Sequence, residues 1–224
     1  MADFIFAGAS SAMAQQARQQ LQSAGHRVIG ISRNQDVQGY DALYTITDYC
    51  AQYPTIEGEL SGLVYFPGSI NLKPFARITA SEFENEWRLH TLGAITFLQK
   101  YHKQIKNGSV VLLSTVAVQT GMPFHSSVAM VKGALEGLTR ALAAEWAPNI
   151  RVNAIAPSLV ETPMAERFLS TEEKLEQIQK RHPLKRHGTV QDIANAIEFL
   201  LTDKSSWMSG TVLQIDGGMS NLKL

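Results

Sequence analysis

Short apolar runs alternate with helix-like patterns along the whole sequence, and this alternation restricts the possible folds more than any other feature. The predicted strands cover residues 3–7, 27–32, 43–46, 62–66, 109–113, 151–155 and 211–215. The predicted helices cover residues 12–24, 81–104, 126–147 and 190–201. Strands that alternate with helices favour a parallel sheet with helices packed against it. Because no linker or repeat interrupts the pattern, we predict one α/β domain over residues 1–224.

The composition excludes several classes of protein. The chain is 45% hydrophobic, and its 20 Lys and Arg residues balance its 20 Asp and Glu residues. It is too apolar to be disordered, and its balanced charge disfavours a nucleic-acid-binding protein. No run of about 18 apolar residues is present to span a membrane, and Asp3 lies where a secretion signal needs positive charge.

Cysteine and histidine usage gives a further expectation. The single cysteine, Cys50, cannot form an internal disulfide, which fits a reducing compartment. The six histidines are scattered and form no metal-binding motif. We therefore predict a cytoplasmic protein that acts on a small molecule, with no metal and no nucleic-acid or membrane partner.

The loop between the first predicted strand and the first predicted helix is rich in small residues. It contains Gly8, Ser10, Ser11 and Met13 and leads directly into the helix. Free backbone N–H groups and the positive end of the helix dipole would face an anion there, and small side chains would let a phosphate approach the main chain. The loop predicts a pyrophosphate site, and an ordinary tight strand–helix turn is the alternative.

Polar residues end the second predicted strand, where a dinucleotide-binding fold recognises the adenosine ribose. They are Ser32, Arg33 and Asn34. An acidic residue at this point binds a free 2′-hydroxyl, whereas the guanidinium of Arg33 can bind a 2′-phosphate through two hydrogen bonds. These residues favour NADP(H) as the cofactor, and an exposed turn arginine is the alternative.

Further motifs match a known family over essentially the whole chain. The sequence resembles the short-chain dehydrogenase/reductase family at the Gly8 loop, at Arg33 and at residues 112–115, 132–138, 151–157, 161–164, 183–188 and 216–219. The resemblance implies a Rossmann-like, doubly wound sheet of about seven parallel strands with helices on both faces. It also implies a nicotinamide cofactor and a homodimer or homotetramer, in which Leu138, Leu142 and Trp146 would face a second copy.

The resemblance implies a catalytic set of Asn, Ser, Tyr and Lys, and the chain departs from this set at three places. Lys132 is kept, but Val128 stands one helical turn earlier, where the family has its tyrosine. Valine has no ionisable group and cannot donate a proton. Thr115 replaces the serine and keeps a hydroxyl, and His90 replaces the asparagine. The sequence is therefore identified as a divergent member of the family that lacks the catalytic tyrosine.

The positions that hold the cofactor in the family are better kept. Gly68 is retained from the family's turn after the fourth strand, and Pro157, Val160 and Thr162 match the segment that holds the nicotinamide half. The resemblance assigns Lys132 to the hydroxyls of the nicotinamide ribose.

A carbonyl reduction at this site would still need an acid, because an alkoxide released without a proton is a poor product near neutral pH. His125 precedes the missing tyrosine by three residues, and it can lean into the cleft or face the solvent. His90 can carry a proton or hold a water, or it can fill the space of the asparagine. Tyr65 is a further phenol near the expected cleft.

The polar segment 161–187 is predicted to be a lid over the substrate. The residues and the resemblance together predict an NADP(H)-dependent oxidoreductase that interconverts a carbonyl and an alcohol by hydride transfer, with an altered proton donor. The alternative is a catalytically silent NADP(H)-binding sensor or partner subunit.

Overall fold

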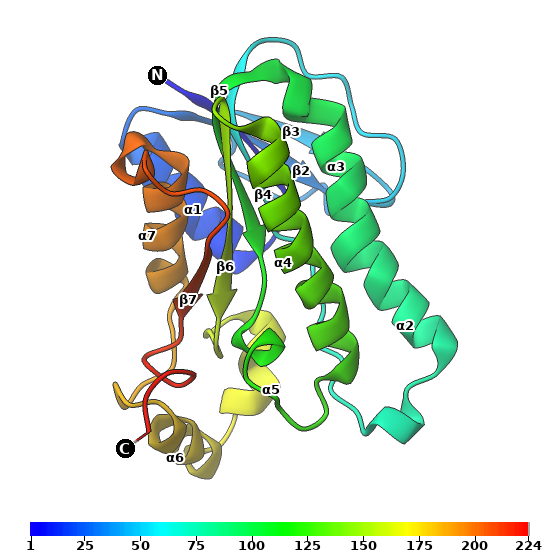
Figure 1. Ribbon diagram of the computed structural model, residues 1–224, viewed down its shortest axis with the longest axis vertical. Coiled ribbons are helices and arrows are strands. Elements are labelled where there is room, and N and C mark those ends of the chain that lie inside the picture. Colours follow the sequence, from blue (N-terminus) through cyan, green and yellow to red (C-terminus); the bar gives the residue numbers. More distant parts are fainter. Residues whose placement is uncertain (224) are drawn as a thin grey trace.

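The computed structural model describes residues 1–223 and contains one parallel sheet of seven strands (Figure 1). Across the sheet the strand order is β3-β2-β1-β4-β5-β6-β7. The strands are β1 (Asp3–Ala7), β2 (Arg27–Ser32), β3 (Ala42–Thr45), β4 (Leu60–Tyr65), β5 (Ile105–Leu113), β6 (Ile150–Pro157) and β7 (Val212–Ile215). The prediction of a Rossmann-like, doubly wound parallel sheet is confirmed.

Helices cover both faces of this sheet (Figure 1). On one face lie α1 (Ala12–Ser23) and α7 (Val190–Leu201), whose apolar residues share a core cluster. On the other face lie α3 (Gly93–Tyr101) and α4 (Ser126–Trp146), which build the second cluster. The inner strands β1, β2, β4, β5 and β6 are therefore largely buried on both sides, which explains their nearly continuous apolar runs in the sequence.

The central strand β1 shows how one sequence serves both layers. Phe4 and Phe6 pack in the cluster under α1 and α7, whereas Ile5 and Ala7 pack in the cluster under α3 and α4. Successive side chains of a strand point to opposite faces, so all four positions must be apolar. β1 therefore anchors both layers at the centre of the sheet.

The predicted helix over residues 81–104 is interrupted. It consists of α2 (Ala80–Trp87), a π-helical turn (Arg88–Leu92), α3 and a 3₁₀ turn (His102–Gln104). In a π turn a backbone carbonyl can lack the N–H group that it would bind in a regular α-helix. The Leu89 carbonyl in this turn accepts a hydrogen bond of 2.6 Å from the Tyr65 hydroxyl. The wider turn buries His90 and Thr91 against the rest of the fold.

The segment predicted to be a lid forms short helices at the carboxyl ends of the strands (Figure 1). These are a 3₁₀ turn (Pro163–Ala165), α5 (Glu166–Leu169) and α6 (Glu172–Arg181). A parallel bridge between Val160 and Gly188 joins the two ends of the segment.

The side chains named for an oligomer contact lie against the chain's own core. Leu138, Leu142 and Trp146 are partly buried beside the cluster under α3 and α4. The Trp146 ring also stacks on His102, with 5.1 Å between the ring centroids. The homodimer or homotetramer stays a prediction. None of the helices described in residues 1–223 is long and apolar enough to cross a membrane.

Gly93 sits where the π turn meets the sheet, and its substitution tests this packing. A Cβ atom at Gly93 would lie 2.2 Å from the Tyr65 hydroxyl oxygen and 3.1 Å from the Tyr49 Cβ. We expect Gly93→Ala to lower the free energy of unfolding by about 1–3 kcal/mol, as overpacking does in well-packed cores. Chemical denaturation measures the change. The control is Gly121→Ala, because no atom lies within 4 Å of its Cβ position; an equally small effect in both variants would contradict the packing.

Candidate cofactor and active site

A cavity of about 640 Å³ opens at the carboxyl ends of the strands. Its walls come from the loops that follow β1, β2, β4, β5 and β6, and from the lid segment. The strand order reverses its direction of winding between β1 and β4, which leaves a crevice at this edge of a parallel sheet. The cavity therefore lies where the fold leaves room for a ligand.

The loop after β1 has the features expected of a phosphate site. Gly8 adopts a φ of 80°, and a Cβ atom there would lie 2.9 Å from the Pro67 Cδ atom, so only glycine fits. Ser11 is the N-cap residue of α1 but makes no side-chain capping hydrogen bond. The first N–H groups of the helix therefore lack a side-chain acceptor, which favours an anionic ligand. Ser10, Ser11 and Met13 line the cavity, as predicted.

Arg33 lines the same cavity at the end of β2. Its guanidinium carbon lies 5.3 Å from the centre of the Tyr49 ring, and Tyr49 also lines the cavity. The other two residues predicted at this point are not among the lining residues. Ser32 is fully buried, and its hydroxyl oxygen accepts a hydrogen bond of 2.9 Å from the Asn34 N–H. These two residues shape the turn that presents Arg33.

On α4, Val128 and Lys132 lie one turn apart and both line the cavity. Lys132 is only 7% exposed, and its ammonium donates a hydrogen bond of 2.7 Å to the Leu113 carbonyl. Burial lowers the pKa of Lys132 to about 8, and the nearby Glu86 carboxylate opposes this change. The position of the family's tyrosine is therefore an apolar wall beside a buried ammonium.

His90 lies on the π turn and also lines the cavity, although its side chain is only 1% exposed. Its Nε2 atom is 3.1 Å from the Ser69 backbone nitrogen, 2.9 Å from the Ser69 hydroxyl and 3.2 Å from a Glu86 carboxylate oxygen. Burial lowers the pKa of His90 to about 4, Lys132 acts in the same direction, and Glu86 opposes both. His90 is therefore neutral near pH 7.

The partners Glu86 and Ser69 were missed by the sequence reasoning. Glu86 precedes His90 by four residues, which is the spacing of neighbours on one helix face, and this signal could have revealed the pair. The predicted residue Gly68 closes the same corner. A Cβ atom there would lie 3.0 Å from the His90 Cε1 atom and 3.8 Å from the Lys132 Nζ atom. Glycine therefore keeps the space between the two side chains open.

The remaining predicted residues divide between the cavity and the core. Pro157, Val160 and Thr162 line the cavity, and so does Thr115. His125 also lines it, and its Nδ1 atom lies 2.7 Å from the Pro123 carbonyl oxygen, which leaves Nε2 free.

Tyr65 does not line the cavity, so the suggestion of a donor there was wrong. Its hydroxyl donates to the Leu89 carbonyl, and burial among the aromatic rings of the core raises its pKa. The alternation of β4 turns this side chain into the cluster under α3 and away from the ligand crevice.

The charge of the cavity lining has one sign. Arg33, Lys132, Lys174 and Arg181 line it, and none of the described lining residues is Asp or Glu. Such a lining favours a ligand that carries several negative charges. Among residues 1–223, no group of three His, Cys, Asp or Glu side chains could hold a metal ion.

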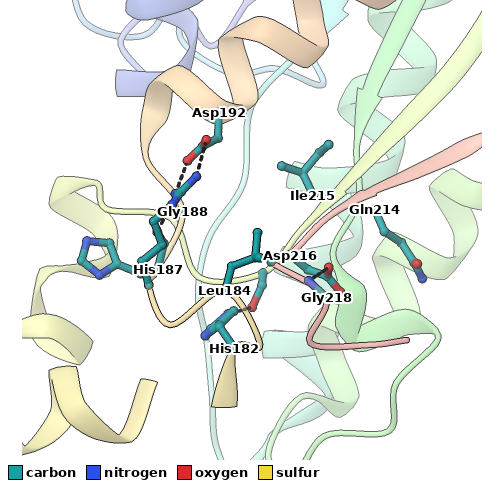
Figure 2. Close-up of a pocket in the computed structure, with 12 residues that line it drawn as sticks. His182, Leu184, His187, Gly188, Asp192, Gln214, Ile215, Asp216 and Gly218 are labelled. Atoms are coloured by element: carbon teal, nitrogen blue, oxygen red, sulfur yellow. Dashed lines mark hydrogen bonds and ion pairs between the residues drawn. The ribbon is translucent and has the colours of Figure 1, made fainter. Parts of the chain in front are cut away.

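A second, smaller hollow of about 330 Å³ (Figure 2) shares lining residues with the main cavity. Ser158 and His182 line both spaces and form part of the wall between them. The His182 Nδ1–H donates to the Ile178 carbonyl at 2.7 Å, so its Nε2 accepts from the Ser158 hydroxyl at 2.9 Å. This pair joins α6 of the lid segment to the end of β6.

A doubly wound parallel sheet with a cationic cavity at its switch point is the architecture of the dinucleotide-binding α/β class. A family model described as enoyl-(acyl carrier protein) reductase matches residues 2–220. An L-xylulose reductase from Bos taurus is 30% identical over 230 residues, which cover 96% of this chain and 94% of that protein. The chain belongs to the short-chain dehydrogenase/reductase family.

One further relative agrees on the family, and two solved structures share the fold. A tropinone reductase homolog from Arabidopsis thaliana is 38% identical over 174 residues, which cover 73% of this chain and 52% of that relative. The match thus spans about half the length of this plant relative. A gluconate 5-dehydrogenase from Burkholderia cenocepacia in complex with NADP and tartrate has a TM-score of 0.91 at 20% identity, covering 99% of this chain and 96% of that one. An aldohexose dehydrogenase from Thermoplasma acidophilum, in ligand-free form, has a TM-score of 0.88 at 24% identity, covering 99% and 95%.

The buried imidazole of His90 makes the free energy of unfolding depend on pH. The pKa of His90 falls from 6.5 to about 4 on folding, so between these values the unfolded chain binds a proton that the folded chain does not. Stability rises with pH wherever the unfolded state binds more protons. We expect this group to lower the free energy of unfolding by about 2 kcal/mol as the pH falls from about 6.5 to about 5, at about 1.4 kcal/mol per pH unit.

Denaturant titrations across this pH range measure the effect. In His90→Asn the corresponding part of the pH dependence disappears, because asparagine does not titrate. Parallel curves for the two proteins would contradict the assignment of a neutral, buried imidazole.

Proposed function

We propose that the chain is an NADP(H)-dependent oxidoreductase that interconverts a carbonyl and an alcohol on a small molecule, with an altered proton donor. The observation that carries this proposal is the cavity at the switch point, where Gly8, Arg33 and Lys132 face one space. The L-xylulose reductase relative, aligned over nearly the whole chain, supports the same class of reaction. We also propose that residues 1–224 act as one cytoplasmic domain, with residues 161–187 as its substrate lid.

The residues that line the cavity fit the dinucleotide. In this proposal the Gly8 loop, with Ser10, Ser11 and Met13, holds the pyrophosphate against the start of α1. Arg33 binds the 2′-phosphate, and Lys174 and Arg181 add positive charge to the same space.

At the other end of the cavity, Lys132 and Gly68, with Pro157, Val160 and Thr162, hold the nicotinamide half. The bound cofactor supplies or takes the hydride. The protein must then orient the substrate oxygen and deliver or accept one proton. Thr115 offers a hydroxyl for the orientation, and Lys132, His90 and His125 are the titratable side chains of the cavity near Val128.

The alternative function is a catalytically silent NADP(H)-binding sensor or partner subunit. Val128 favours it, because no phenol stands one turn before Lys132. Cofactor binding is common to both functions, so turnover distinguishes them.

Cofactor preference tests the proposal first. Arg33 gains a charged partner with NADPH and loses it with NADH, and a charge-assisted bidentate contact contributes about 1.5–3 kcal/mol. We expect NADPH to bind about ten- to a hundred-fold more tightly than NADH, and Arg33→Ala to abolish that difference. Fluorescence titration of both cofactors measures it.

The control for this titration is Arg77→Ala, which removes an exposed arginine that does not line the cavity. It should keep the preference for NADPH. Equal affinities in the native protein, or a preference that survives Arg33→Ala, would contradict the role of Arg33. Failure to bind either cofactor would remove both candidate functions.

The missing tyrosine can be restored by Val128→Tyr. The new phenol would lie one helical turn from the Lys132 ammonium, and a positioned general acid is worth about 10²–10⁴-fold in rate. We therefore expect faster NADPH oxidation with a panel of carbonyl compounds. Met130→Tyr places the same side chain on the exposed face of α4 and should leave the rate unchanged.

The outcome in the native protein separates the two functions. Turnover by the native protein supports the oxidoreductase. Binding of NADPH without turnover, followed by turnover in Val128→Tyr, supports the sensor or partner subunit. A variant that binds NADPH as the native protein does and gains no rate would contradict a preserved site around Lys132.

A further inference from the structure

The lid helix α6 carries charges of both signs and separates them around its axis. Its positions 174, 177, 178 and 181 line the main cavity, and this spacing is that of one helix face. Lys174 and Arg181 are the charged residues of that face. At about 100° per residue, Glu172 and Glu176 lie about 160° around the axis from Lys174, and neither lines the cavity. The helix therefore turns positive charge toward the cavity and negative charge away from it.

The helix dipole does not account for this arrangement. Acidic residues in the first turn and basic residues in the last turn stabilise a helix, and Glu172, Glu173 and Arg181 follow that rule. Lys174 opposes it, because it is the third residue of the helix and lies in the first turn. A cation at this end interacts unfavourably with the dipole. The position of Lys174 over the cavity therefore needs another explanation.

The two cations are not neutralised by carboxylates of the described chain. The Lys174 ammonium donates hydrogen bonds to the Arg167 carbonyl at 2.8 Å and to the Ser170 hydroxyl at 3.1 Å, and both acceptors are neutral. The ion pairs found within residues 1–223 include neither Lys174 nor Arg181. Both charges are therefore available to an anionic ligand in the cavity.

The lid that carries these charges is fastened to the rest of the site. At the end of α6, the His182 ring accepts the hydrogen bond of 2.9 Å from Ser158, which follows β6. On α5, the Arg167 guanidinium donates a hydrogen bond of 2.8 Å to the carbonyl of Ile70, which lines the cavity after β4. Charges that are held in place before a ligand arrives cost less entropy on binding. The fold thus positions the cationic face of α6 in advance.

The phosphates of the cofactor have other partners in the proposed function. Arg33 follows β2 and binds the 2′-phosphate, and the start of α1 holds the pyrophosphate. Arg181 precedes His182, which is bonded to Ser158 at the end of β6. Four strand spacings separate β2 from β6, or about 19 Å at about 4.8 Å each. Arg181 therefore belongs to the opposite end of the cavity, where the nicotinamide half and the substrate are placed.

We propose that Arg181, supported by the charge of Lys174, binds an anionic group of the substrate, so that the substrate is a small carbonyl compound with a carboxylate or a phosphate. The inference rests on the proposed function and adds the class of its substrate. A guanidinium binds either anion through two parallel hydrogen bonds, whereas an ammonium acts as a point charge. Arg181 is thus the specificity-determining residue, and Lys174 strengthens the field around it.

Matched pairs of carbonyl compounds test the substrate class. For the carboxylate, 2-oxopentanoate and 4-oxopentanoate are each compared with their methyl esters, which keep the ketone and lose the charge. For the phosphate, dihydroxyacetone phosphate is compared with dihydroxyacetone. Because both cations are exposed, we expect kcat/KM with NADPH to favour the anion about ten-fold in one of these pairs. The preference should fall as salt is added. The pair that shows it distinguishes a carboxylate from a phosphate.

Variants of α6 show whether Arg181 causes the preference. Arg181→Gln removes the charge and should lower the preference at least about three-fold, mainly through KM, because the anion is bound alike in the ground and transition states. Adding Lys174→Gln should bring the two substrates of the pair close to equal. The control is Lys180→Gln, because Lys180 is exposed, pairs with Glu176 at 3.5 Å and does not line the cavity. It should keep the native preference.

The affinity for the cofactor separates the two ligands that Arg181 could bind. Fluorescence titration should show a Kd for NADPH that changes less than about two-fold in Arg181→Gln. A loss of NADPH affinity as large as the loss for the anionic substrate would assign Arg181 to the cofactor and overturn the inference.

Calorimetry of the complex with NADP⁺ tests the inference without turnover. The anion of the favoured pair should bind more tightly than its neutral partner, and Arg181→Gln should remove the difference. Equal affinities in every pair, or no binding of any compound, would overturn the inference. If the protein binds NADPH but reduces no carbonyl compound, the proposed function fails, and the calorimetric comparison still decides whether the cavity selects an anion.

Discussion

The reversal of winding between β1 and β4 is the constraint on which the rest of the structure depends. The chain leaves these two neighbouring strands on opposite faces of the sheet, so their following loops part and leave a crevice. Gly8 can approach Pro67 across that crevice only because it has no Cβ atom. Every strand-end loop that lines the cavity is held by a strand buried on both faces, which makes the site rigid on the sheet side.

The chemistry of the cavity follows from where charge is buried. Lys132 and His90 share a low-polarity corner, and burial disfavours the charged form of both. Glu86 is the carboxylate that compensates, and it stands behind His90 and outside the cavity lining. All the Arg, Lys, Asp and Glu side chains that line the described cavity are therefore positive ones, which suits an anionic cofactor. The same arrangement keeps an ammonium beside the apolar wall of Val128.

Much of this was predictable from the sequence, for clear physical reasons. Strands buried on both faces produce uninterrupted apolar runs, and the small-residue loop and Arg33 follow strand ends at predictable places. The π turn at Arg88–Leu92 was not predictable, because it contacts residues far away in the sequence, such as Tyr65, whose hydroxyl donates to the Leu89 carbonyl. Tyr65 was placed wrongly near the cleft, because the alternation of side chains along β4 directs it into the core cluster under α3. Ser32 and Asn34 were expected to contact the cofactor, but their mutual hydrogen bond turns them into support for Arg33.

The most direct test of the central claim is a crystal structure of the protein grown with NADP⁺. The account predicts the dinucleotide in the cavity of about 640 Å³, with its pyrophosphate at the start of α1, its 2′-phosphate within hydrogen-bond distance of Arg33 and its nicotinamide ribose beside Lys132. A dinucleotide bound in the hollow of Figure 2, or one whose 2′-phosphate lies away from Arg33, would contradict it.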